Sequence, residues 1–162
     1  MTRINPFLWF DTQAEPAAHL YVSIFPNSKI TAVARNTEAA PGPTGRVLTV
    51  EFELDGRTFV ALNGGPAHKL TEAFSLQIGC ETQAEVDRYW DALTADGGEP
   101  GPCGWLKDPF GLSWQVVPNL LPKLLTSSDR TRANRVMAAM MQMRKLDIAA
   151  LQAAADGVPA AG

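Results

Sequence analysis

A four-residue repeat is the feature that most constrains the fold of this chain. Thr12-Gln13-Ala14-Glu15 recurs as Thr82-Gln83-Ala84-Glu85. Each copy follows a short apolar run typical of a strand, at residues 7–10 and 74–78, and precedes an amphipathic segment with helical periodicity. Threonine followed three residues later by glutamate predicts a capping box at the start of each helix. A strand–cap–helix unit that occurs twice predicts two related modules.

The rest of each module is predicted to be extended. Further strands are expected at residues 29–35, 47–54, 57–62, 102–107 and 112–117. Residues 47–54 alternate between polar and apolar side chains, and Asp55-Gly56 is a strong signal for a two-residue hairpin turn. A second turn is expected at residues 108–111. We therefore expect each half to be a β-α-β-β-β module, an α+β arrangement, with three strands after the helix identified in the first half and two in the second.

The character of the chain changes after Pro118. Helices are predicted at residues 129–144 and 147–155, and Val136, Met137, Met140 and Met141 form an apolar stripe on the first of them. Such a stripe favours packing, either in the protein's own core or against a second subunit, over a ligand groove.

The predicted organisation is a domain at 1–120 followed by a C-terminal helical extension at 121–162. The domain comprises two modules at about 4–65 and 72–118. Composition supports an ordinary globular protein, because 46% of the residues are hydrophobic and only 19% are charged.

Charge and composition also narrow the possible partners and location. The formal net charge is −3, whereas nucleic-acid binding normally requires a basic face. No apolar run is long enough to span a membrane, and the N-terminus lacks the features of a signal peptide. Two cysteines, Cys80 and Cys103, are too few for a disulfide scaffold. We therefore expect a cytoplasmic protein that binds neither nucleic acid nor membrane.

Several local motifs resemble one branch of a known superfamily. They are Asn5-Pro6-Phe7-Leu8-Trp9-Phe10-Asp11, Phe25-Pro26-Asn27-Ser28, Gly64-Gly65-Pro66, Cys103-Gly104-Trp105-Leu106-Lys107-Asp108 and the segment from Phe110 to Pro118. The chain resembles the PhnB-like group of the vicinal-oxygen-chelate (glyoxalase/bleomycin resistance) superfamily, whose members are often labelled demethylubiquinone-methyltransferase-like. The resemblance implies paired βαβββ modules, a cup-shaped cavity and a homodimer.

Enzymes of this superfamily bind a divalent metal through His and Glu side chains on strands that face the cup. The corresponding positions here carry Asn5, Ala73 and Gln115. Amides are poor ligands for zinc, nickel or iron. The chain has only two histidines, His19 and His68, so we predict no metal and no cofactor.

Strand alternation predicts the residues that line the cup. The candidate ligand-binding set combines four aromatic side chains with amides and hydroxyls: Phe7, Trp9, Phe59, Trp105, Asn5, Asn63, Gln77, Gln115, Ser75 and Ser113. Gln115 is expected to point into a cavity shared with Trp9 and Ser113 and to bond with Asn5, Ser75, a water or a ligand. The alternative is that these aromatics simply fill the core of the sheet.

Three functions are compatible with these features. The first is a metal-independent protein that binds an unknown small molecule. The second is an enzyme, either a metal-dependent lyase or oxygenase or a methyltransferase. The third is a structural dimer with a filled cup. Neither strand-to-helix turn carries the glycines of a nucleotide-cofactor site, and Cys103 has no histidine nearby in sequence that could activate it. We therefore favour the first function.

Overall fold

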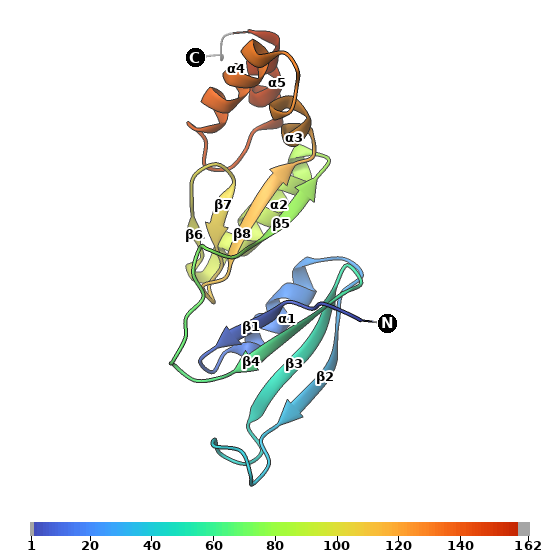
Figure 1. Cartoon of the computed structure of the whole chain (residues 1–162), viewed down its shortest axis with the longest axis vertical. Coiled ribbons are helices and arrows are strands. Elements are labelled where there is room, and N and C mark those ends of the chain that lie inside the picture. Colours follow the sequence, from blue (N-terminus) through green and yellow to red (C-terminus); the bar gives the residue numbers. More distant parts are fainter. Residues whose placement is uncertain (1, 159–162) are drawn as a thin grey trace. The chain divides into compact units, whose positions relative to one another are not determined.

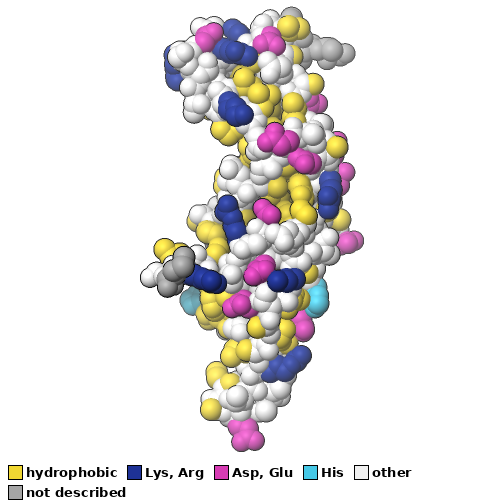
Figure 2. Space-filling model, turned by 90° about the vertical axis from the view of Figure 1, so that its right-hand side faces the viewer, with side chains coloured by type: hydrophobic (Ala, Val, Ile, Leu, Met, Phe, Trp, Pro, Cys, Tyr) yellow, Lys and Arg dark blue, Asp and Glu magenta, His cyan; other side chains and the backbone are white. Residues whose placement is uncertain are grey.

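The computed structural model describes residues 2–158, which divide between Leu70 and Thr71 into two compact units (Figure 1). The division falls between the two predicted modules, and the C-terminal helices belong to the second unit. No helix in the described part of the chain is long and apolar enough to cross a membrane. Acidic and basic side chains are intermixed on the face drawn in Figure 2.

The first unit is one βαβββ module, as predicted. Its elements are β1 (Phe7–Phe10), α1 (Ala14–Ile24), β2 (Lys29–Arg35), β3 (Val47–Leu54) and β4 (Arg57–Asn63). The strands form one sheet in the order β1-β4-β3-β2, in which β1 runs parallel to β4 and the other neighbours are antiparallel. Helix α1 covers one face of this sheet (Figure 1).

The hairpin between β3 and β4 fixes which side chains face that helix. Asp55 and Gly56 both have positive φ, 47° and 73°, as the predicted two-residue turn requires. The turn pairs Leu54 with Arg57, and the register continues to Phe52 opposite Phe59. The rings of Phe52 and Phe59 stack at 5.5 Å, and both side chains are buried. The core of the unit therefore lies between the sheet and α1.

The second unit repeats the module and adds three helices. Its elements are β5 (Ser75–Cys80), α2 (Gln83–Thr94), the 3₁₀ helix η1 (Ala95–Gly97), β6 (Glu99–Pro100), β7 (Trp105–Lys107), β8 (Ser113–Pro118), α3 (Leu120–Leu125), α4 (Arg130–Met140) and α5 (Ile148–Asp156). The strand order β5-β8-β7-β6 matches that of the first sheet. The α+β fold with paired βαβββ modules and C-terminal helices is thus confirmed.

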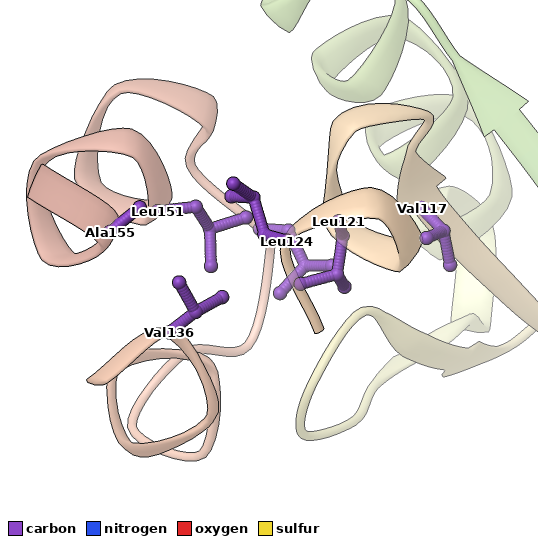
Figure 3. Close-up of a cluster of buried hydrophobic side chains, with 7 residues drawn as sticks. Val117, Leu121, Leu124, Val136, Leu151 and Ala155 are labelled. Carbon is purple, nitrogen blue, oxygen red and sulfur yellow. The ribbon is translucent and has the colours of Figure 1, made fainter. Parts of the chain in front are cut away.

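The C-terminal helices pack around a hydrophobic cluster beyond the end of β8. Leu121 and Leu124 of α3, Val136 of α4 and Leu151 of α5 point toward one another (Figure 3). Met140 and Met143 pack against the edge of this cluster, whereas Met137 and Met141 are 42% and 57% exposed. The predicted methionine stripe is therefore only partly packed within this unit. Residues 159–162 of the predicted extension lie outside the described residues.

Polar contacts fasten this helical extension to the module. The side-chain amide of Gln83 donates to the Leu146 carbonyl oxygen (3.1 Å) and accepts from the Ile148 N–H (2.8 Å). Lys145 forms ion pairs with Asp87 and Asp91 of α2. The segment that leads into α5 is thereby bound along the first two turns of α2.

The two predicted helix caps have different outcomes. Thr82 and Glu85 form the full capping box at the start of α2, which confirms the prediction there. The prediction for Thr12 is wrong, because α1 begins at Ala14 after Gln13, which makes no side-chain cap bond. Asn63 Oδ1 instead accepts the Ala14 N–H at 2.8 Å. A side chain from the end of β4 therefore takes over the role that sequence assigned to Thr12.

Candidate functional site

The open face of the second sheet, opposite α2, carries the polar side chains predicted for a ligand site. Gln115 of β8 lies between Gln77 of β5 and Trp105 of β7 in the strand register. Its Nε2 donates to Ser75 Oγ at 2.9 Å. The expectation that Gln115 bonds to one of its named partners is confirmed for Ser75. This bond fixes the orientation of the amide on the sheet surface.

Ser113 places a hydroxyl two residues before Gln115 on the same face of β8. Its side chain is only 1% exposed, and its Oγ is buried without a hydrogen-bond partner among the described residues. A buried hydroxyl in that state costs on the order of 1–3 kcal/mol. Such an unsatisfied group is where a buried water is expected to bind. Ser113 does not line the pocket that Gln115 lines, so the structure does not bring its hydroxyl to that site.

A pocket of about 350 Å³ opens beside Gln115. The sheet and the loop before β7 contribute one side of the pocket, and the C-terminal helices contribute the other. The lining residues are Gln77, Cys103, Trp105, Gln115, Val117, Leu121, Pro122, Leu125, Thr126 and Met140. Its volume lies within the range of about 300–1,000 Å³ that is usual for small-molecule sites. Three of the predicted site residues, Gln77, Trp105 and Gln115, meet here.

A buried carboxylate holds the turn that leads into β8. Asp108 is 3% exposed, and its Oδ1 accepts the backbone N–H groups of Phe110 (2.8 Å) and Leu112 (3.1 Å). Its Oδ2 accepts the Trp114 indole N–H at 2.8 Å. These bonds fix the start of the strand that carries Ser113 and Gln115. Sequence reasoning identified the turn but missed the role of Asp108.

Backbone bonds join the loop before β7 to the C-terminal extension. Cys103 has a positive φ of 56°, and its N–H donates to the Met143 carbonyl oxygen at 2.8 Å. The Gly104 N–H donates to the Arg144 carbonyl oxygen at 2.7 Å. The half-buried thiol of Cys103 lies 3.7 Å from the Met141 sulfur. Cys103 therefore marks the point where module and extension meet at the pocket.

The predicted site residues of the first unit do not line the pocket beside Gln115. Phe7 is 60% exposed on the sheet face that α1 does not cover, and Asn5 is exposed ahead of β1. The Trp9 indole N–H donates to the Gly65 carbonyl oxygen (2.9 Å), and its ring meets His68 edge-on at 4.8 Å. A Cβ on Gly64 would lie 2.4 Å from the Trp9 ring, so only glycine fits there. The prediction that Trp9 and Gln115 share a cavity joins residues of two units and stays a prediction.

Two residues of β4 were assigned to the wrong face of the sheet. Phe59 stacks on Phe52 on the side that α1 covers, so it belongs to the core. Asn63 caps α1 through Oδ1 and donates from Nδ2 to the Val47 carbonyl oxygen at 3.0 Å. Asn63 does line a separate pocket of about 380 Å³ at the end of β4, together with the loop at 41–47. None of the other predicted site residues lines that pocket.

The donor chemistry of the second unit does not suit a transition metal. Gln115 offers only a neutral amide, and its nitrogen is already bonded to Ser75. Within residues 2–158, no group of three or more His, Cys, Asp or Glu side chains is placed to hold a metal ion. Burial raises the pKa of the Cys80 thiol to about 11, which keeps it protonated in the core.

Comparison with known proteins places these features in a family. Residues 2–117 match the family described as 3-demethylubiquinone-9 3-methyltransferase. A PhnB protein from Bacillus cereus, described under the same methyltransferase heading, shares 32% identity with a TM-score of 0.63. That similarity covers 72% of this chain and 99% of the Bacillus protein. A search of curated proteins found no significant match.

More distant structures share the fold. Fosfomycin resistance protein FosX from Mesorhizobium loti has 13% identity and a TM-score of 0.56, covering 78% of this chain and 98% of its own. FosX from Listeria monocytogenes has 16% identity and a TM-score of 0.51, covering 74% and 93%. At these identities the likeness concerns the fold alone.

Proposed function

The chain belongs to the 3-demethylubiquinone-9 3-methyltransferase family, in its PhnB-like form. From that premise, we propose that it binds a small molecule without a metal. The site is the pocket on the open face of the second sheet. The observation that carries the proposal is the combination of an apolar pocket of about 350 Å³ with an oriented amide at Gln115.

The polar groups beside the pocket support recognition of a ligand rather than a filled core. Gln115 is half-buried, with its amide held by Ser75, and Gln77 and Thr126 bring further polar side chains to the same lining. A convergent set of a few polar groups on an apolar wall is typical of small-molecule sites.

The helix starts favour binding over nucleotide-dependent catalysis. A nucleotide-like cofactor normally uses free N–H groups at a helix N-terminus. Here Asn63 takes the Ala14 N–H of α1, and Thr82 takes the Glu85 N–H of α2. Glu85 also accepts from the N–H groups of Glu81 and Thr82. The protein's own side chains thus occupy donors that such a cofactor would require.

A thermal-shift screen of a metabolite and antibiotic library tests this function. Wild type, Gln115→Ala and the exposed control Gln142→Ala are screened in parallel, with and without a chelator. We expect compounds that stabilise wild type and Gln142→Ala, regardless of chelator, but stabilise Gln115→Ala less. Equal stabilisation of all three proteins would remove Gln115 from the site, and hits that the chelator abolishes would refute metal independence.

A further inference from the structure

Half of the pocket wall comes from residues outside the segment that matches the family. The match ends at residue 117, whereas the pocket is completed by α3 and the end of α4. The contributing residues are Leu121, Pro122, Leu125, Thr126 and Met140. Whatever binds on the open face of the second sheet therefore also contacts this added wall.

The added wall is held in place before any ligand arrives. The Gln83 amide bonds to the backbone at Leu146 and Ile148, and the N–H of Cys103 bonds to the Met143 carbonyl oxygen. Leu121 is buried in the cluster shared with the other C-terminal helices. A preorganised wall favours binding because little conformational freedom is lost when the ligand binds.

The chemistry of the lining defines the class of ligand. The described lining contains no Asp, Glu, Lys, Arg or His, and the polar groups that it does contain belong to Gln77, Gln115, Thr126, Trp105 and Cys103. A charged ligand would lose water here without gaining an opposite charge, which is strongly unfavourable. A neutral ligand with one polar end can instead bond to the amide of Gln115 and place its apolar part against Leu125 and Met140.

We propose that α3 and Met140 form the specificity-determining wall of this pocket and select an uncharged, largely apolar molecule that carries one hydrogen-bonding group. This rests on the proposed function, since it concerns the same site. It adds the chemical class of the ligand and assigns selectivity to the C-terminal extension. The amide at Gln115 then recognises the polar end.

Equilibrium dialysis with two matched probes tests the proposal on the full chain. At pH 7, 2-naphthol is neutral and 2-naphthoate is an anion with the same ring system. We expect 2-naphthol to bind at least roughly tenfold more tightly, because the lining offers the anion no opposite charge. Leu125→Ala and Met140→Ala should each weaken 2-naphthol binding by roughly tenfold or more, since each lost methylene contact costs about fourfold and each truncation removes at least two such contacts.

Two matched controls separate the wall from general effects on the extension. Leu120→Ala makes the same truncation in α3, but Leu120 packs on the hydrophobic cluster and does not line the pocket, so 2-naphthol affinity should stay unchanged. Thr126→Lys places an ammonium group at the exposed rim of the pocket and should improve 2-naphthoate binding. Ser128→Lys adds the same charge outside the lining and should not.

The outcomes distinguish this proposal from the proposed function. If library compounds bind in a Gln115-dependent manner but 2-naphthol does not bind, or 2-naphthoate binds equally well, the ligand class is wrong while the function stands. If Leu120→Ala weakens binding as much as Leu125→Ala does, the wall assignment is wrong. If Leu125→Ala weakens 2-naphthol binding but Gln115→Ala does not, the wall assignment is correct. The assignment of Gln115 as the polar contact of the ligand, which belongs to the proposed function, is then wrong.

Discussion

Replacing Gln83 with alanine should weaken the attachment of the C-terminal extension to the second module. Its side-chain amide makes two bonds to the backbone of that extension, at Leu146 (3.1 Å) and Ile148 (2.8 Å). Each bond contributes about 0.5–1.5 kcal/mol net. Leu146 is fully buried, so its carbonyl oxygen would also be left without this partner. Together these effects predict a loss of roughly 2–4 kcal/mol in the free energy of unfolding.

The first copy of the repeat offers a matched control. Gln13 occupies the position equivalent to Gln83, but it is exposed and makes no side-chain cap bond. Gln13→Ala should therefore change the free energy of unfolding by less than about 0.5 kcal/mol. Urea denaturation measures both variants, and hydrogen exchange at the Ile148 amide reports the local contact. Equal stability of Gln83→Ala and Gln13→Ala, with unchanged protection at Ile148, would refute the reasoning.

Four further outcomes are expected. Asp108→Asn should lower the free energy of unfolding in urea by roughly 3 kcal/mol, because one acceptor that serves Phe110, Leu112 or Trp114 becomes a donor. The Lys145 hydrogen bond, with a smaller contribution from Gln83, lowers the pKa of Asp87. This stabilisation is present above the unfolded pKa of about 3.9 and is lost as the pH falls through the folded value, so the stability gap between wild type and Asp87→Asn should close below about pH 4. In a thiol titration of native protein, Cys103 should react while Cys80 should not, and a reactive thiol in native Cys103→Ser would contradict this. Sedimentation velocity should show a homodimer that Met137→Glu and Met141→Glu weaken, and a wild-type monomer at every concentration would contradict it.

The fold could be predicted because its signals are local. The repeated tetrapeptide, the alternating strand at 47–54 and the Asp55-Gly56 turn each act over a few residues. The assignment of Phe59 to the cup was wrong, although the sequence contained the information needed to place this residue correctly. A two-residue turn pairs Phe52 with Phe59, and paired residues share a face. The hairpin register was therefore a better guide than strand alternation alone.

Other features depend on contacts between distant residues. Thr12 does not cap α1. The side chain of Asn63, which lies 49 residues from Ala14 in the sequence, accepts the Ala14 N–H instead. The short helix α3 has too few residues for a clear period, yet it forms much of the pocket wall. Gln115 was placed correctly because β8 alternates regularly between its two faces. Helix α3, which supplies most of the wall that completes this pocket, leaves no comparable signal in the sequence.

The backbone bonds at Cys103 and Gly104 determine where this protein can be shortened. The family match ends at residue 117, which suggests a convenient C-terminal cut. That cut would remove Met143 and Arg144, whose carbonyl oxygens accept the two N–H groups, and would uncover Val117 and the pocket side of Trp105. A fragment ending there would carry an apolar, unsatisfied surface prone to self-association. The module and the extension are therefore best expressed, engineered and exchanged as one piece.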